Sequence, residues 1–276
     1  MHETATDTLA AAAQGIAPHM SESHEIVPGS IASGVIVLCD HASNHIPPEY
    51  DDLGLPKGEL ARHIAWDIGA QGIARALAQR LGAPAIISRF SRLLIDPNRG
   101  QDDPTLVMRI SDGAVIPGNA HVDKAEIARR KARFYEPYDD AISATIGRFR
   151  ACGIHPALVS IHSFTPVWRG LKRPWHAAVL YDPRDAGFSR HVLDALARDS
   201  ELIIGGNEPY KGGLSGDTMD RQGFARGLRH VLLEVRQDLI FHQKGQEDWA
   251  RRIERAIRAA LDATGGIGPG SRGTAT

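Results

Sequence analysis

The fold of this chain is decided by residues 35–48, which read Val-Ile-Val-Leu-Cys-Asp-His-Ala-Ser-Asn-His-Ile-Pro-Pro. Five apolar residues in a row, most of them β-branched, predict a strand that is buried on both faces. The strand leads directly into the polar side chains of Asp40, His41 and Asn44. Open α/β sheets bind ligands beyond the carboxyl ends of their strands, so these side chains stand where a site is expected.

The rest of the chain alternates between predicted strands and predicted helices. Apolar runs predict further strands over residues 85–88, 92–95, 157–161, 177–181, 202–204 and 230–236. Helical spacing of apolar residues predicts helices over residues 57–81, 124–150, 187–199 and 246–263. This alternation predicts a single α/β domain of three layers, with a mixed, mostly parallel central sheet and helices on both of its faces.

The two ends of the chain lack this periodicity. They are rich in small and polar residues, and no apolar pattern of helix or strand runs through them. We therefore expect a flexible N-terminal arm over residues 1–30, one domain over residues 31–264 and a flexible tail over residues 265–276.

The charge balance gives no reason to expect nucleic acid or a membrane as a partner. The chain has 276 residues, with 32 Lys and Arg against 33 Asp and Glu, for a formal net charge of -1. Binding to nucleic acid needs an excess of positive charge, and no apolar run reaches the roughly 20 residues of a membrane span. Cys39 and Cys152 form no disulfide framework and no thiolate metal motif. We expect a cytoplasmic protein whose partner is a small molecule, and the oligomeric state stays open.

Two histidines, His41 and His162, each follow a predicted buried strand directly. Imidazole nitrogens and carboxylate oxygens suit zinc, and a catalytic zinc site has three protein ligands and one open position for water. His63 and Asp67 lie four residues apart on the predicted helix over residues 57–81, so they share a face that could border the strand ends.

Glu234 is a carboxylate inside the apolar run of residues 230–236. A buried carboxylate is costly unless it is paired or faces a polar cavity. Two explanations are open: a salt bridge to Arg236 or Arg99, or a general base that activates water and passes the proton to a leaving amine. Arg99, with Arg92, also offers a planar fork that matches a substrate carboxylate.

Three other segments bear on the site. Residues 205–217 form a loop whose five glycines allow close approach to a ligand. Within it, residues 213–217 resemble a nucleophile elbow, but Asp217 stands where the second glycine belongs, which argues against a serine nucleophile. The irregular pattern of residues 101–118 predicts a long functional loop or lid. On the predicted helix over residues 124–150, basic residues are expected to form a solvated face: Arg129, Arg130, Lys131 and Arg133.

Taken together, these motifs resemble the N-formylglutamate amidohydrolase family over about residues 34–245. The resemblance is carried by Asp40-His41-Ala42-Ser43-Asn44 with Ile46-Pro47, Trp66-Asp67, Arg92 through Asp96-Pro97-Asn98-Arg99, Ile161-His162-Ser163, Asn207-Glu208-Pro209-Tyr210 and Leu233-Glu234-Val235-Arg236. The family is in turn similar to zinc carboxypeptidases and aspartoacylase, which use an H-x-x-E motif.

The resemblance implies one Zn²⁺ per chain, held by His41 and His162. The fourth position of H-x-x-E is Asn44 here, a poor zinc ligand, so we prefer Asp67 as the third ligand. Asn44 stays an alternative, and His45 and His63 are lesser candidates. The resemblance also implies Glu234 as the general base and a set of substrate-binding residues: Asn44, Arg92, Asn98, Arg99, Asn207 and Tyr210.

The activity that the resemblance implies is zinc-dependent removal of a formyl or other small acyl group from an N-acyl amino acid such as N-formyl-L-glutamate, with a place in histidine degradation. Two alternatives are a carboxypeptidase-like metallopeptidase and a ligand-binding relative without catalysis. No feature of the sequence specifies the side chain of the substrate, because a fold does not determine its substrate.

Overall fold

The centre of the molecule is one eight-stranded mixed sheet. A computed structural model describes residues 15–266. In spatial order the strands are β13 (Ile204–Gly206), β12 (Ala177–Leu180), β14 (His230–Arg236), β9 (Ala157–Phe164), β5 (Val35–Cys39), β6 (Ala85–Ser88), β3 (His24–Val27) and β2 (His19–Met20). The central strands β14, β9, β5 and β6 run parallel, whereas β12 is antiparallel to β14, and β3 is antiparallel to both β6 and β2. The prediction of a mixed, mostly parallel sheet is confirmed.

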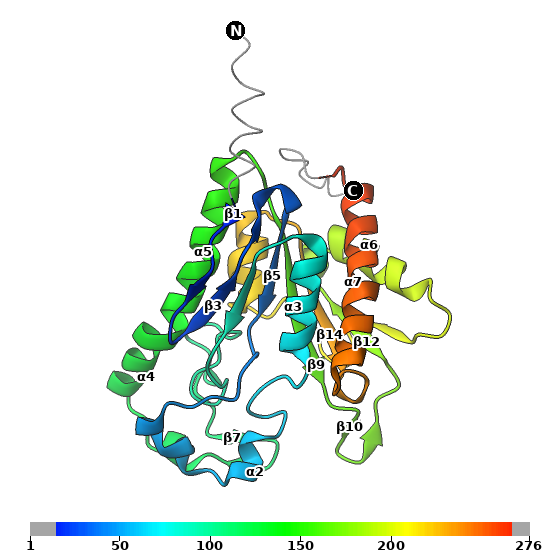
Figure 1. Cartoon of the computed structure of the whole chain (residues 1–276). Coiled ribbons are helices and arrows are strands. Elements are labelled where there is room, and N and C mark those ends of the chain that lie inside the picture. Colours follow the sequence, from blue (N-terminus) through cyan, green and yellow to red (C-terminus); the bar gives the residue numbers. More distant parts are fainter. Residues whose placement is uncertain (1–14, 267–276) are drawn as a thin grey trace.

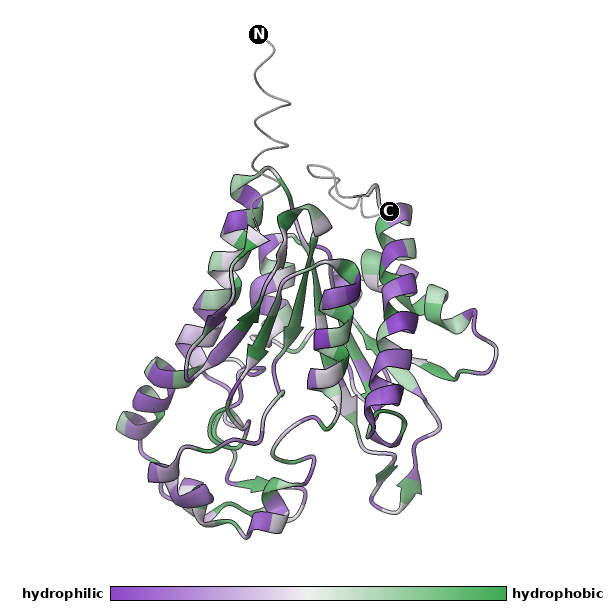
Figure 2. Ribbon diagram, in the orientation of Figure 1, coloured by the Kyte–Doolittle hydropathy of each residue, from purple (hydrophilic) through white to green (hydrophobic). Residues whose placement is uncertain are grey.

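Helices cover both faces of the sheet (Figure 1). One face packs against α3 (Ala70–Leu81), α6 (Gly187–Ala197) and α7 (Gln243–Ala263). The other packs against α5 (Glu136–Ala151), which continues α4 (Lys124–Arg130) through a π-helical turn, η4 (Lys131–Tyr135). Figure 2 shows hydrophobic strands in the middle and many hydrophilic residues along the helices. The three-layer prediction is therefore confirmed.

The two-residue period of the strands decides which side chains face the site. On β14, Val231, Leu233 and Val235 belong to the core under α3, α6 and α7. Glu234 therefore points to the α5 side of the sheet. The same alternation in β9 turns His162 to that side, and the parallel register places His162 opposite Glu234. Strand pairing thus brings two polar side chains together that lie far apart in the sequence.

The predicted N-terminal arm is wrong for residues 15–30. β3 pairs with β6, β2 pairs with β3, and β1 (Gly15–Ile16) pairs with β4 (Gly29–Ser30). The Glu25 carboxylate also accepts a hydrogen bond from Arg75 on α3, at 2.8 Å. The pairing of β3 with β6 and the contact with Arg75 join this segment to residues remote in sequence, which no local periodicity in residues 15–30 could indicate. Residues 1–14 and most of the predicted tail, 267–276, lie outside the described residues.

The helix predicted over residues 57–81 is wrong in its middle. The chain forms α2 (Lys57–Leu60) and α3, and turns separate them. Gly69 ends this break with a φ of 83°, and a Cβ there would lie 2.4 Å from the Ile240 carbonyl oxygen, so a glycine is required. The Asp67 amide donates instead to the His41 carbonyl at 2.9 Å. His63 and Asp67 therefore do not share a helix face.

The strand predicted over residues 92–95 is also wrong. Leu93, Leu94 and Ile95 are buried as expected, but Leu93 and Leu94 lie in a turn and Ile95 in the irregular segment after it. Asn119 donates to the Leu93 carbonyl at 2.8 Å, and Arg130 donates to the Leu94 carbonyl at 2.9 Å. Side chains thus satisfy backbone groups that a strand would have paired. Arg130, predicted on a solvated face, is only 2% exposed.

The remaining elements are short. Two hairpins, β7 (Ile110–Ser111) with β8 (Ala114–Val115) and β10 (Val167–Trp168) with β11 (Leu171–Lys172), gather with α2 at the lower end of Figure 1, where β5 and β9 end. Short helical turns complete the described chain: η1 (Ile31–Ser33), η2 (Pro48–Gly54), η3 (Pro117–Asn119), η5 (Pro183–Asp185), η6 (Met219–Gly223), η7 (Phe224–Arg226) and η8 (Gln237–Leu239). Among the described residues, no helix has both the length and the apolar character to cross a membrane.

Candidate metal centre

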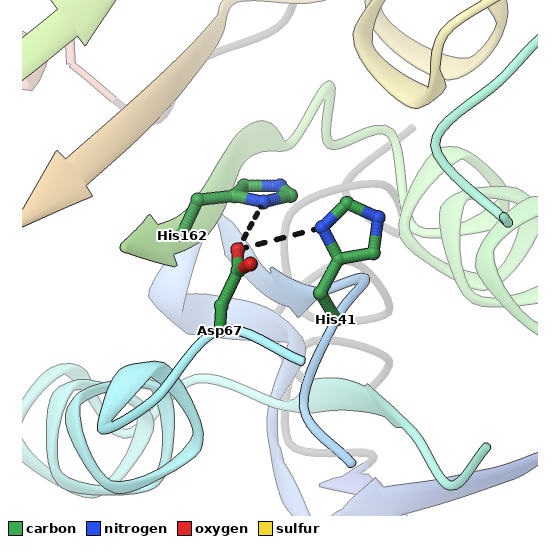
Figure 3. Close-up of side chains that lie close together, drawn as sticks. All are labelled: His41, Asp67 and His162. Atoms are coloured by element: carbon green, nitrogen blue, oxygen red, sulfur yellow. Dashed lines mark hydrogen bonds and ion pairs between the residues drawn. The ribbon is translucent and has the colours of Figure 1, made fainter. Parts of the chain in front are cut away.

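Three buried side chains, His41, Asp67 and His162, converge at the carboxyl ends of the central strands. His41 follows β5, His162 lies near the end of β9, and Asp67 lies in the turn before α3. Asp67 Oδ2 lies 2.8 Å from His162 Nδ1 and 3.4 Å from His41 Nδ1, as the dashed lines of Figure 3 show. One ligand atom from each residue lies within 4.8 Å of the others. The structure therefore brings together the three residues that we predicted as metal ligands.

The second ring nitrogen of each histidine contacts another buried carboxylate. His41 Nε2 lies 2.7 Å from Asp96 Oδ1, and His162 Nε2 lies 3.0 Å from Asp40 Oδ2. A carboxylate on one ring nitrogen orients the ring and leaves the other nitrogen for a metal. Both Nδ1 atoms face Asp67, so the two rings are oriented for the same point. His41 Nδ1 also lies 3.2 Å from Arg92 Nη1, a contact that a metal ion on this nitrogen would replace.

Asp40 is held by donors from several elements. Its Oδ1 accepts from Tyr138 and Thr218, at 2.9 and 3.0 Å, and its Oδ2 accepts from Ser160 at 2.9 Å. Burial raises the pKa of this carboxyl, but the hydrogen bond and charge of His162 outweigh burial, so the pKa lies below its usual range. Asp40 is therefore an anion in a rigid frame.

The cluster favours a positive charge. Burial lowers the pKa of His162, yet its hydrogen bonds to Asp40 and Asp67 hold that pKa well above its usual range. A metal ion supplies the same positive charge and replaces protons on its ligands. Two imidazole nitrogens and a carboxylate oxygen form a donor set that zinc accepts, with one position left open. The residues present thus fit a catalytic zinc ion.

Glu234 faces this cluster from β14. It is opposite His162 in the strand register, and its Oε2 is buried without a hydrogen-bond partner. Burial raises the pKa of Glu234 to about 7. Neither of the expected salt bridges forms, because Arg236 pairs with Asp238 at 2.8 Å and Arg99 donates to Asn98 and Thr105. Glu234 is therefore a carboxyl group with free acceptor capacity beside the candidate metal site.

A cavity of about 230 Å³ opens over these residues. Four of the predicted substrate-binding residues line it: Arg92, Asn98, Arg99 and Tyr210. Asn44 and Asn207 do not line it, since Asn44 donates to the Leu60 carbonyl at 2.9 Å and Asn207 bonds the backbone of Tyr181 and Gly212. Of the lesser ligand candidates, His63 lines the cavity and His45 does not.

The two arginines in the cavity differ in their partners. Arg92 donates to Asp96 at 2.8 Å and lies 3.7 Å from Asp67, so its charge is already paired. Arg99 has no acidic partner within ion-pair distance among residues 15–266. Only Arg99 offers a guanidinium that an external carboxylate could pair with fully.

Sequence reasoning missed the partners that orient this site. Asp96, Tyr138, Ser160 and Thr218 were assigned no role, and Asp40 was placed in the expected site without a role of its own. Polar residues beside His41 and His162 were a usable signal for Asp40 and Ser160. Tyr138 and Thr218 carry no local signal, because helix packing alone places them there.

The fold and this site together define an α/β domain with a buried histidine–carboxylate cluster in a cavity at the carboxyl ends of its central strands. A family model, N-formylglutamate amidohydrolase, matches residues 33–241. The chain belongs to the N-formylglutamate amidohydrolase family. Membership of this family supports hydrolysis of an amide bond.

Two solved structures are similar to this chain. A gene product of Agrobacterium tumefaciens is 33% identical, with 88% of this chain and 96% of that chain covered and a TM-score of 0.82. N-formylglutamate amidohydrolase from Ralstonia eutropha JMP134 is 18% identical, with 88% and 98% covered and a TM-score of 0.59, and it shows the same fold. A search of curated proteins finds no match.

Proposed function

We propose that this protein is a zinc-dependent amidohydrolase that removes a formyl or other small acyl group from an N-acyl amino acid. The observation that carries the proposal is the buried, unpartnered Oε2 of Glu234 beside the cluster of His41, Asp67 and His162. A buried carboxyl oxygen without a partner lowers the stability of the fold, and a role in proton transfer during amide hydrolysis explains why it is present.

In this proposal His41, Asp67 and His162 hold the zinc ion, which when bound polarises the amide carbonyl and makes water a stronger nucleophile. Glu234 accepts a proton from the attacking water and donates it to the nitrogen of the leaving amine. Burial raises the pKa of Glu234, which favours a group that both accepts a proton and returns it near neutral pH. The products are formate, or another small acid, and a free amino acid.

Arg99 and Asn98 are proposed to hold the α-carboxylate of the substrate. Arg99 lacks an acidic partner, and both residues line the cavity. Asn98 Oδ1 accepts from the Thr218 amide at 3.0 Å, which leaves the Asn98 amide nitrogen as a donor. Fixing the carboxylate would place the acyl group relative to Glu234.

The experiment that tests this function measures release of free amine from N-formyl-L-glutamate and a panel of other N-formyl and N-acetyl amino acids. The zinc-loaded protein is compared with a chelated sample and with Glu234→Gln. Release that requires both zinc and Glu234 is the expected result. If the protein releases the C-terminal residue of N-acyl dipeptides and leaves N-acyl amino acids uncleaved, the metallopeptidase alternative replaces the proposal. No turnover of either substrate class by zinc-loaded protein would contradict it.

A further inference from the structure

One end of the cavity has a composition that the proposed reaction does not explain. Leu180 on β12, Leu232 on β14, and Gly212 and Asp217 of the loop after β13 line both the main cavity and a small extension beside it. We call these four residues the inner subsite. Its two leucines are 6% and 7% exposed and Asp217 is 5% exposed. Asp217 is thus the one ionisable residue of the four. The extension is also lined by Asp182 and Asp220, which both pair with Arg184, and by His230.

Asp217 has an acceptor that the protein does not use. Its Oδ1 accepts from the Asp220 amide at 2.7 Å, and its other oxygen has no hydrogen-bond partner among residues 15–266. Arg221, the nearest cation in sequence, pairs instead with Asp139 at 3.0 Å. Burial raises the pKa of Asp217 above its usual range. An oxygen without a partner at a cavity wall is available to a donor from a bound molecule.

We propose that the inner subsite receives the side chain of the N-acyl amino acid, and that Asp217 selects side chains ending in a hydrogen-bond donor over side chains ending in a carboxylate. This inference rests on the proposed function. Leu180 and Leu232 would contact the methylene groups of the substrate, and an amide or ammonium terminus would donate to Asp217. A carboxylate terminus would bring a second negative charge against the buried Asp217 carboxylate, which disfavours binding.

Lys211 is the competing determinant, because it lines the same cavity and forms no ion pair within the described residues. It would favour an acidic side chain. Lys211 is exposed, whereas Asp217 is buried. Charges in contact with water are screened and contribute little, while buried charges interact strongly. The burial of Asp217 therefore makes Asp217, rather than Lys211, the residue that determines the preference for a substrate side chain.

The test uses two substrates of nearly equal shape, N-formyl-L-glutamine and N-formyl-L-glutamate. For the zinc-loaded protein we expect kcat/KM to be at least about tenfold higher for the glutamine compound. Asp217→Asn should bring the ratio close to one, and it keeps the acceptor for the Asp220 amide, so the turn is preserved. Lys211→Gln is the matched control and should leave the preference for glutamine in place.

Preference for the glutamate compound, or a ratio that Asp217→Asn leaves unchanged, would overturn the inference. A lack of turnover of both compounds would contradict the proposed function, so binding decides the inference separately. Titration of each compound into zinc-loaded Glu234→Gln measures the two affinities by calorimetry. At least about tenfold tighter binding of the glutamine compound supports the inference. Equal affinities, tighter binding of glutamate, or no binding of either compound would refute it.

Discussion

The buried carboxylates around the cavity lie on two walls, which differ in whether the protein supplies hydrogen-bond partners for the carboxylate oxygens. On the first, which we call the paired wall, every carboxylate oxygen of Asp40, Asp67 and Asp96 has a partner in the protein. On the second, the open wall, Glu234 Oε2 has none and Asp217 uses only one oxygen. Asp67, Glu234 and Asp217 line the same cavity, whereas Asp40 and Asp96 lie behind it, on the Nε2 atoms of His162 and His41.

This difference in partners separates the residues that orient the site from those that are free to act on a ligand. The carboxylates of the paired wall bond to groups inside the protein, and two of them hold the rings of His41 and His162. On the open wall, Glu234 Oε2 is buried without a hydrogen-bond partner, which costs stability. Such a cost is expected where a group must stay free for a substrate or a proton. Substitutions on the two walls should therefore have opposite effects on stability.

The largest effect is expected for Glu234→Gln on the open wall. The amide keeps the shape of the side chain but cannot accept a proton, so kcat should fall by about a thousandfold. Removing an uncompensated charge should leave the free energy of unfolding unchanged or raise it by about 1 kcal/mol. Amine release, urea denaturation and zinc content measure the three quantities. Turnover near the wild-type value, with zinc content unchanged, would remove Glu234 from the mechanism.

Asp40→Asn on the paired wall should do the reverse. The variant loses the charge that holds His162, so we expect a loss of about 3 kcal/mol in the free energy of unfolding. Zinc affinity should fall by about 10- to 100-fold, because the ring loses its orienting carboxylate. Urea denaturation of the metal-free protein and zinc titration measure these effects. Asp185→Asn, at an exposed carboxylate, is the matched control, and equal behaviour of the two variants would remove the distinction between the walls.

The sequence predicted Glu234 on the open wall and Asp67 on the paired wall, but it gave Asp217 no part in the site. Glu234 stands out because it interrupts an apolar strand, and the two-residue period of β9 and β14 then determines its direction. His41 and Asp67 were predicted, but Asp67 lies in a break between α2 and α3, not on the continuous helix proposed to present it. The partners of Asp40 could not be predicted, since they come from α5, β9 and the turn before η6. Strand order and helix packing create those contacts, and neither leaves a local pattern.

Arg99→Ala should have a smaller effect, confined to substrate binding. Arg99 has no acidic partner, so its loss should raise KM by about tenfold, the lower end expected for a hydrogen bond to a charged group, and leave stability unchanged. Arg92→Ala should instead lower the free energy of unfolding, because Arg92 pairs with Asp96. Steady-state kinetics and urea denaturation separate the two outcomes. Arg109→Ala, at an exposed arginine that does not line the cavity, is the control. A normal KM for Arg99→Ala would exclude it from substrate binding.

The smallest effect is expected at His24, a buried histidine far along the sheet from either wall, on β3. Its Nδ1 contacts the Ser23 hydroxyl at 2.9 Å rather than a carboxylate. Burial, together with the charge of His19, lowers the pKa of His24 to about 4, whereas the carboxylates around His162 raise the pKa of that ring. The pKa values of these two buried histidines thus shift in opposite directions because only His162 has anionic partners.

The sign of the stability effect follows from the lowered pKa. Below a pH of about 6.5 the unfolded chain binds a proton at His24 that the folded chain does not, so the contribution is full above that pH and is lost as pH falls toward 4. After allowance for screening near the surface, we expect the wild-type protein to lose about 1 kcal/mol relative to His24→Asn between pH 7 and pH 5. Urea denaturation of both proteins across this range measures the difference. Parallel stability profiles would show that His24 is protonated in the folded protein and that hydroxyl partners suffice to hold its charge, which would weaken the distinction drawn between paired and unpaired buried groups.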